Sequence, residues 1–386
     1  MRYRVFMTVW GARYVAKFLE LALPTHFSPG NLGAVAADAD VIYTIYTDRE
    51  SVDALRAGVE ALDPPCPVEF AYFDEIPHRG GTIAEALANS DPRIVKHTVQ
   101  RISSHHLLAR AAEDADCAVL LLDSDFILGD GALANAHTLR RQGRKVAAAM
   151  HMRLSDEAAG GAIRARLAED VPLTGRELVG LGLERLHHVD REHFVDSERF
   201  TAYPSHLNWR VGTAGFVTHC FFPHPLMVVP PPGGLRFFSS LDYEIALRAS
   251  DDEGAIHLSR DSDDMLICKI SADSYRVGEG GAGTPNLETM ARFAVDNTNI
   301  RHRLFMEQPI RFRAGGTEAE WQMAERESTR FVGGIYKAAE LIIAAAEAGN
   351  PRNLVYLKSF LGPIEDFMSP ATHARLSGWI PRERGG

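Results

Sequence analysis

Strands and helices alternate through residues 1–150, and this alternation limits the fold more than any other feature of the sequence. Short apolar or β-branched runs have the length of strands, namely Tyr3 to Val9, Val41 to Tyr46, Val68 to Phe73, Cys117 to Leu122 and Lys145 to Met150. Segments with helical spacing lie between them, among them Ala12 to Leu23, Ser51 to Leu62 and Pro92 to Glu113. Strands that alternate with helices in this way predict an α/β fold with a mostly parallel sheet and helices on both of its faces.

Two carboxylates directly follow the fourth of these strands. Val119 to Leu122 is a short apolar run, and Asp123 and Asp125 come next, separated by Ser124. Ligands of open α/β sheets bind just beyond the carboxyl ends of the strands. Two acids at such an end repel each other and lose hydration, and a hard divalent cation such as Mg²⁺ or Mn²⁺ removes both costs. The alternative is an Asp-rich turn in which Asp123 or Asp130 caps the next helix.

The segment from Ala118 to Asp130 resembles the Asp-x-Asp region of GT-A-type glycosyltransferases. It is most similar to the version in which an apolar strand, Asp-Ser-Asp, an apolar pair and Gly-Asp follow one another. The resemblance covers about the first 270 residues, and Val5 to Trp10 is similar to the opening strand and its nucleotide-facing end. It implies a GT-A-like fold with a Rossmann-type, mostly parallel central sheet, and two acids that hold Mn²⁺ or Mg²⁺ on the diphosphate of a nucleotide sugar.

The same resemblance assigns ligand-binding roles to residues along the chain. The nucleotide is expected to contact six residues at strand ends: Thr8, Trp10, Thr47, Asp48, Asp123 and Ser124. The metal ligands are expected to be Asp123, Asp125 and a histidine nearer the C-terminus. His219, His224 and His257 are the candidates, and His224 is favoured because the prolines on either side fix its backbone. An ordinary structural hydrogen bond is the alternative for each. The His-x-x-Gly-x-x-Lys signature of one retaining subgroup is absent from the sequence.

Asp242 and Glu244 are the expected catalytic residues. GT-A enzymes often place an acid at the start of a helix that faces the acceptor, and the sequence Leu241 to Glu244 lies at a corresponding position. Such a carboxylate removes a proton from the acceptor hydroxyl as the sugar is transferred. Asp242 also satisfies the rule for a helix N-cap, so capping is the alternative role.

The chain is expected to have two parts. Residues 1–285 form the predicted catalytic domain, with a nucleotide-binding half at 1–150 and an acceptor-side half at 151–285. Residues 286–386 read as a helical C-terminal extension. Its apolar residues, such as Trp321 and Tyr336, indicate a face that packs on the catalytic domain. Formation of a homo-oligomer through these helices and peripheral docking to a membrane-bound acceptor are the alternatives.

Composition excludes several other functions. The formal net charge of −10 argues against a general nucleic-acid binder, which would need a basic face. The four cysteines are far apart and form no Cys-x-x-Cys pair, which favours a reducing cytoplasm over a disulfide framework or zinc cage. Neither a signal peptide nor a transmembrane run is recognised in the sequence.

The sequence therefore predicts a metal-dependent, hexosyltransferase-like glycosyltransferase that moves a sugar from a nucleotide sugar to a glycan, lipid-linked or protein acceptor. A phosphatase or phosphotransferase of the haloacid-dehalogenase type is one alternative, because its hallmark is also an apolar strand followed by Asp-x-Asp. That family has a Thr shortly after the second Asp, where this chain has Phe126 and Ile127. A non-catalytic carbohydrate-binding protein with a degenerate site is the other alternative.

Overall fold

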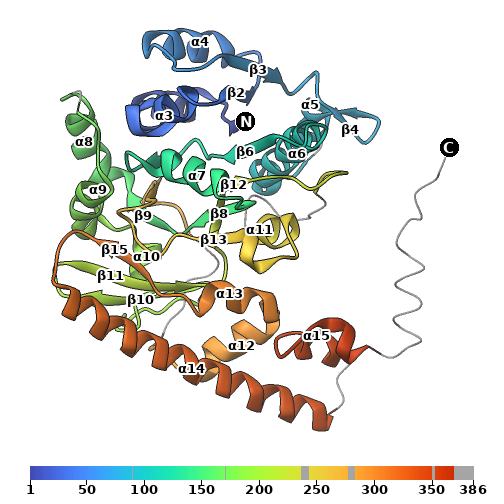
Figure 1. Ribbon diagram of the computed structural model, residues 1–386, viewed down its shortest axis with the longest axis vertical. Helices are drawn as coiled ribbons and strands as arrows, with labels where there is room; N and C mark the ends of the chain where they lie inside the picture. The colour runs from blue at the N-terminus through green and yellow to red at the C-terminus, as the bar shows by residue number, and fades with distance from the viewer. Residues whose placement is uncertain (89, 170, 236–242, 277–282, 350–352, 369–386) are drawn as a thin grey trace.

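The structure, a computed structural model, describes all residues except 89, 170, 236–242, 277–282, 350–352 and 369–386. Figure 1 shows a central sheet between helices, with the long helix α14 (Glu318–Gly349) running along one end of the molecule. No helix in the described ranges combines the length and the apolar character needed to cross a membrane.

The central sheet has seven strands among the described residues, in the order β13-β8-β12-β6-β1-β2-β3. The strands are β1 (Arg2–Thr8), β2 (Asp40–Thr47), β3 (Val68–Tyr72), β6 (Cys117–Leu121), β8 (Val146–Ala149), β12 (His224–Val228) and β13 (Ile256–Leu258). Neighbouring strands are parallel, except that β12 is antiparallel to both β6 and β8. The predicted α/β class and its mostly parallel central sheet are confirmed.

Helices cover both faces of this sheet. The α-helices of the described chain, of which those from α12 onward pack mainly away from this sheet, are α1 (Ala12–Lys17), α2 (Leu23–Phe27), α3 (Ala34–Ala36), α4 (Val52–Ala61), α5 (Ile83–Ala88), α6 (Pro92–Ala112), α7 (Ala132–Arg141), α8 (Asp156–Leu167), α9 (Gly175–Gly182), α10 (His188–Arg191), α11 (Tyr243–Ala249), α12 (Leu287–Asn297), α13 (Arg303–Met306), α14 and α15 (Leu354–Lys358). Side chains of β6 alternate between two cores, with Val119 and Leu121 in one and Ala118 and Leu120 in the other. This alternation, which any strand imposes, buries β6 on both faces.

The register of β1 and β6 fixes where the functional residues emerge. The two strands run in the same direction, and Phe6 lies opposite Leu121. The pairing ends with a hydrogen bond from the Leu122 amide to the Phe6 carbonyl. Thr8 and Asp123 therefore leave the sheet at the same edge, beyond the carboxyl ends of their strands.

A second, three-stranded sheet lies directly beyond the acid pair. It consists of β7 (Phe126–Leu128), β14 (Ile267–Ser271) and β9 (His151–Ser155), with β14 in the middle. Phe126 pairs with Lys269 across the antiparallel β7 and β14. The amide of Ile270 also donates a hydrogen bond to the carbonyl of Asp125. These pairings bring a strand from late in the sequence against the acid pair.

The C-terminal segment is mostly helical, as expected, and it also adds a strand. β15 (Ile310–Arg313) pairs with β11 (Gly215–Cys220), which pairs in turn with β10 (His206–Val211). A short hairpin of β4 (Pro77–His78) and β5 (Gly81–Thr82) lies elsewhere. Helix α14 packs on β10 and β11, so residues after 286 share a core with the preceding part of the chain. The division into domains stays a prediction.

Candidate functional site

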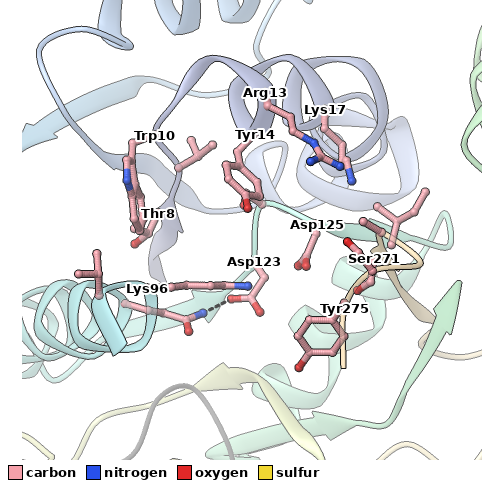
Figure 2. A pocket seen from close by; sticks show the side chains of 17 residues that line it. Thr8, Trp10, Arg13, Tyr14, Lys17, Lys96, Asp123, Asp125, Ser271 and Tyr275 are labelled. Carbon is pink, nitrogen blue, oxygen red and sulfur yellow. Dashed lines mark hydrogen bonds between the residues drawn. The ribbon is translucent and has the colours of Figure 1, made fainter. Parts of the chain in front are cut away.

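A cavity of about 410 Å³ lies at the edge of the sheet where β1 and β6 end. Its walls come from the end of β1 with helix α1, one face of α6, the turn after β6, and the end of β14 with the segment that follows. Figure 2 shows Trp10, Asp123, Asp125 and Tyr275 around this space. The position is the one that open α/β sheets use for ligands.

Five of the residues predicted from the sequence line this cavity: Thr8, Trp10, Asp123, Ser124 and Asp125. The ring of Trp10 packs edge-on against Phe73, with ring centroids 5.4 Å apart. The hydroxyl of Thr8 is buried and has no hydrogen-bond partner in the structure. Because a buried hydroxyl without a partner is costly, Thr8 is suited to bind a polar group of a ligand.

Both carboxylate oxygens of Asp123 already accept hydrogen bonds. Oδ2 accepts from the ammonium of Lys269 at 2.7 Å, and Oδ1 accepts from the side-chain amide of Gln100 on α6. Burial raises the pKa of this carboxyl, but the charge and hydrogen bond of Lys269, together with smaller contributions from other nearby groups, outweigh burial and hold the pKa of Asp123 at about 2. Asp123 is therefore ionised and anchored.

Asp125 has different surroundings from Asp123. Its Oδ1 lies 3.6 Å from the Lys269 ammonium, beyond hydrogen-bond distance. The same oxygen is buried and has no hydrogen-bond partner. Figure 2 shows its carboxylate directed into the cavity. Asp125 therefore keeps one enclosed oxygen without a hydrogen bond, while its side chain as a whole is 20% exposed at the cavity.

Lys269 is a residue at the acid pair that sequence reasoning missed, and it contacts Asp123 from behind without being among the cavity-lining residues. It is the one charged residue in β14, whose sequence is ICKIS and whose other side chains are buried. Its ammonium also lies 5.0 Å from the ring centroid of Phe126. Burial opposes the charged form, whereas Asp123 and Asp125 raise the pKa of Lys269, so the ammonium stays charged. A single lysine in an apolar strand was the available signal, because such a lysine needs an acidic partner.

Other basic side chains line the same cavity. Arg13 and Lys17 come from α1, and Lys96 comes from α6. Lys17 forms an ion pair with Asp156 at the start of α8. Arg13 and Lys96 are exposed, and Figure 2 shows Arg13 on the opposite wall from Lys96. The cavity therefore combines two acids with several cations, which suits a ligand that carries phosphate groups and hydroxyls.

Thr47 and Asp48, predicted to contact the nucleotide, are not among the cavity-lining residues. Asp48 Oδ1 accepts a hydrogen bond of 2.8 Å from the Ser51 amide, and the Ser51 hydroxyl accepts one of 2.9 Å from the Gly11 amide. Asp48 thus joins the start of α4 to the loop after β1. Thr47 is buried at the end of β2, and its hydroxyl has no partner.

His224, the favoured third metal ligand, is buried behind the acid pair. Its Nε2 donates a hydrogen bond of 2.6 Å to the carbonyl of Leu121, and its ring stands edge-on to Phe126. Burial lowers the pKa of His224, so the ring is neutral and Nδ1 keeps its lone pair. His224 is not among the residues that line the cavity. His219 instead joins the Met306 carbonyl to the Ser328 hydroxyl, which is the structural alternative considered for it.

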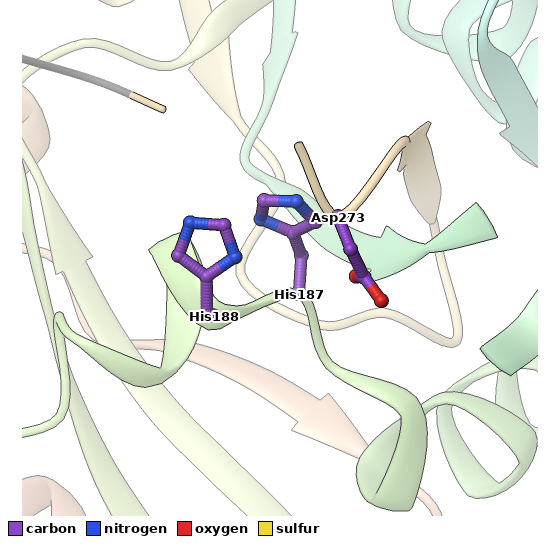
Figure 3. A group of neighbouring side chains, drawn as sticks. All are labelled: His187, His188 and Asp273. Atoms are coloured by element: carbon purple, nitrogen blue, oxygen red, sulfur yellow. The ribbon is translucent and has the colours of Figure 1, made fainter. Parts of the chain in front are cut away.

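The three predicted ligands do not form a compact metal site. Within the described part of the chain, one group of three potential metal ligands has its ligand atoms within 4.8 Å of one another. This group is not the predicted one, because it consists of His187, His188 and Asp273 (Figure 3). His187 already uses both ring nitrogens, accepting from the Val189 amide and donating to the Ala272 carbonyl. Neither set therefore offers three free ligand atoms around one point.

The two predicted catalytic residues fall at the limit of the described chain. Asp242 lies outside the described residues. Glu244 lies in the first turn of α11, and its side chain is outside the described part. α11 packs against β12 on the face of the sheet that α6 also covers. Their roles stay predictions.

No protein-family model and no curated protein matches the sequence. Among solved structures, residues 1–349 of TarS from S. aureus share 14% identity at a TM-score of 0.24, over 40% of this chain and 36% of that chain. Mouse xyloside xylosyltransferase 1 shares 12% identity at a TM-score of 0.25, over 42% of this chain and 57% of that chain. The mannosyltransferase PcManGT from Pyrobaculum calidifontis, solved with GDP-Man and Mn²⁺, shares 12% identity at a TM-score of 0.29, over 98% of this chain and 81% of that chain.

This chain therefore spans only 36% and 57% of the lengths of the first two proteins. TM-scores of 0.24 to 0.29 carry no argument about this protein. The fold class rests instead on the strand order and directions described above.

Proposed function

We propose that this protein is a glycosyltransferase that takes a sugar from a nucleoside-diphosphate sugar. The observation that carries the proposal is the cavity at the ends of β1 and β6, where Asp123 and Asp125 meet Arg13 and Lys96. We assign the nucleoside to the end of the cavity with Thr8 and Trp10, since the Thr8 hydroxyl lacks a partner and an indole ring can stack on a base. The diphosphate then lies beside the acid pair.

Breaking the bond between the sugar and the diphosphate places negative charge on the leaving phosphate. Positive charge held in advance at that position lowers the barrier, because it costs no reorganisation during the reaction. The sequence predicts that Mn²⁺ or Mg²⁺ supplies this charge through Asp123, Asp125 and His224. Since these three ligands do not form a compact site, no step of the proposed reaction is assigned to a metal.

The acceptor is proposed to enter from the side of Tyr275, which lines the cavity beyond β14. A glycan, lipid-linked or protein hydroxyl stays the predicted acceptor class. Asp242 is proposed to remove the proton from that hydroxyl, with Glu244, two residues later in the sequence, as the second candidate. An Asp242→Asn variant is expected to bind the donor and to lose transfer, whereas unchanged transfer would exclude this role.

The experiment that tests the function is a screen of nucleotide sugars against the full chain. A ligand that binds only the folded protein raises its melting temperature, so the donor is identified by thermal shift. Release of the nucleoside diphosphate from that donor is then measured. The expected result is slow donor hydrolysis that Asp125→Asn abolishes. Binding without turnover would instead favour a non-catalytic carbohydrate-binding protein, and phosphate release from simple monoesters would favour a phosphatase.

A further inference from the structure

We propose that the ammonium of Lys269 takes the place of a divalent metal at the acid pair, so that this site binds the diphosphate of its donor without a metal. The inference rests on the proposed function, because it concerns the same cavity. It starts from the position of the ammonium, 2.7 Å from Asp123 Oδ2 and 3.6 Å from Asp125 Oδ1. A single positive charge thus lies next to both acids.

The sheet holds Lys269 in this position. Lys269 pairs with Phe126 across β7 and β14, and Phe126 directly follows the acid pair. The hydrogen bond from the Ile270 amide to the Asp125 carbonyl fixes the two backbones against each other. The ammonium also rests over the Phe126 ring, which favours a cation. The lysine is therefore built into the site by strand pairing and not by a flexible surface contact.

A metal on Asp123 would have to displace groups that are already bound. Both oxygens of Asp123 accept hydrogen bonds, one from Gln100 and one from Lys269. The side chain of Lys269 is only 15% exposed, and that of Asp123 only 13%. Removing one partner of an enclosed ion pair leaves the other charge uncompensated, which is strongly unfavourable. Competition with Lys269 therefore lowers the affinity of Asp123 for any divalent cation.

Positively charged side chains outnumber negatively charged ones around the acid pair and the cavity, which favours binding of a diphosphate. With Lys269 counted, Asp123 and Asp125 keep one net negative charge. Arg13 and Lys96 add two positive charges to the same cavity, while Lys17 is balanced by Asp156. The surroundings of the diphosphate are therefore net positive before any metal binds, and they can hold its charge through charge-assisted hydrogen bonds.

The test measures binding of UDP, GDP, ADP and CDP to the full-length protein by calorimetry, once with EDTA and once with Mn²⁺. For the diphosphate that binds, we expect the Kd in EDTA to lie within about twofold of the Kd in Mn²⁺. Lys269→Met is expected to weaken binding by about tenfold or more in EDTA. Mn²⁺ should then restore much of the loss, because the acids freed of Lys269 can bind a metal.

Two variants serve as controls. Lys337→Met makes the same substitution at an exposed position of α14 and is expected to leave binding unchanged. Lys269→Arg keeps the charge and is expected to retain metal-independent binding. Should Lys269→Met fail to fold, the comparison of the wild type in EDTA and Mn²⁺ decides by itself. Wild-type binding that requires Mn²⁺ would overturn this inference and leave the proposed function standing, whereas no binding under either condition would overturn both.

Discussion

Asp123 and Asp125 are two residues apart, yet the folded chain gives them different partners. Asp123 accepts hydrogen bonds from Lys269 and Gln100, whereas Asp125 keeps one buried oxygen without a partner. The sequence placed both acids at a strand end, and the cavity that they line agrees with that placement. The difference between the hydrogen-bond partners of the two acids was not predictable, because it depends on a lysine that lies 146 residues from Asp123 in the sequence.

The strength of the Asp123–Lys269 pair can be measured by a double-mutant cycle. Asp123→Asn removes one charge and leaves an enclosed ammonium, so we expect a loss of about 3 kcal/mol in the free energy of unfolding. Lys269→Met alone leaves the acids facing each other and should cost a similar amount. The double variant should lose clearly less than the sum of the two, as determined by urea denaturation. Additive losses would show that the two side chains do not interact.

A buried histidine below the acid pair predicts a pH dependence. His26 donates from Nε2 to the Phe126 carbonyl at 3.0 Å and accepts from the Tyr43 hydroxyl at Nδ1. Burial lowers the pKa of His26 from 6.5 to about 4. The unfolded chain therefore binds this proton first, so the stabilisation is complete above pH 6.5 and is lost as the pH falls toward 4. The expected slope for one such group is about 1.4 kcal/mol per pH unit.

Urea denaturation of the wild type and of His26→Gln between pH 7 and pH 4.5 checks this prediction. Glutamine has a donor and an acceptor but no proton to gain in this range. As the pH decreases, the free energy of unfolding of the variant should therefore fall less steeply than that of the wild type. The difference in slope should correspond to about one proton. His193 and His219 also have pKa values lowered to about 4 by burial, so a dependence common to both proteins is expected. Identical slopes in the two proteins would contradict the role given to His26.

At the scale of the element, the pairing of strands and the close approach of their backbones determine positions that the local hydrophobic pattern does not predict. The alternation of helices and strands was read correctly from hydrophobic period, because that period is a local property. β15 was not expected, since four residues between helices carry little periodicity. Its position depends on Gly215 in β11, which has φ of 142°, pairs with Arg313 of β15 and lies against the Phe312 carbonyl.

Substitution of Gly215 tests this close approach. A Cβ at that position would lie 1.9 Å from the Phe312 carbonyl oxygen and 3.0 Å from the Trp321 ring. Gly215→Ala is therefore expected to lower the free energy of unfolding by about 3 kcal/mol, through strain and displacement of β15. Thermal and urea denaturation provide the measurement. An unchanged midpoint would show that β15 does not pack against Gly215 as described.

Gly333 in α14 provides a matched control with the opposite sign. A Cβ there would meet no atom within 4 Å, and the residue lies in the middle of a 32-residue helix. Gly333→Ala is expected to stabilise the protein by about 0.5–1 kcal/mol, because alanine loses less backbone freedom in a helix. Helix α14 continues through Gly333 and Gly334.

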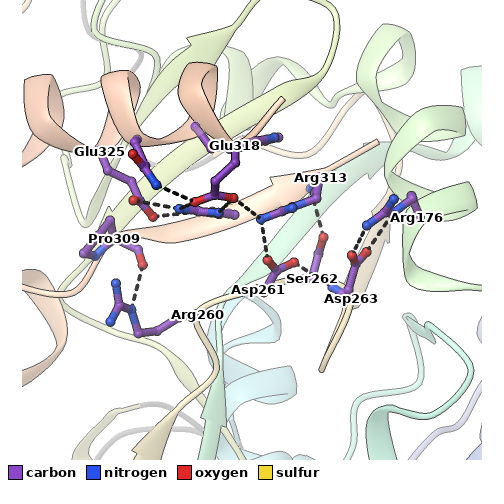
Figure 4. A network of polar contacts seen from close by, with 12 residues as sticks. Arg176, Arg260, Asp261, Ser262, Asp263, Pro309, Arg313, Glu318 and Glu325 are labelled. Carbon is purple, nitrogen blue, oxygen red and sulfur yellow. Dashed lines mark hydrogen bonds and ion pairs between the residues drawn. The ribbon is translucent and has the colours of Figure 1, made fainter. Parts of the chain in front are cut away.

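At the scale of the whole molecule, a network of arginines joins the C-terminal helix to the rest of the chain (Figure 4). Arg311 of β15 forms ion pairs with Glu318 at 2.8 Å and Glu325 at 2.7 Å, both on α14. Arg313 of β15 pairs with Asp261 at 3.0 Å, in the turn before β14. The acidic turn that contains Asp261 therefore holds β15 in place and is not among the residues that line the cavity.

Removal of this junction should weaken the docking of α14. Arg311 is 14% exposed and Glu325 is 18% exposed, so Arg311→Met leaves an enclosed carboxylate without its partner. We expect a loss of about 2–3 kcal/mol in the free energy of unfolding. Arg326→Met, at an exposed position of the same helix, should change it by less than about 0.5 kcal/mol. Equal effects of the two substitutions would exclude a special role for Arg311.

The sequence by itself determined the α/β class, the strand that precedes the acids, and the edge of the sheet at which those acids emerge. These features follow from local hydrophobic period and from the short distance between a strand and the residues after it. Only the tertiary structure decided that Lys269 meets Asp123, that His224 lies behind the cavity, and that β15 joins the sheet of β10 and β11. Each of these depends on pairing between distant segments, and the register of such pairing is set by burial of the whole sheet and not by any one segment.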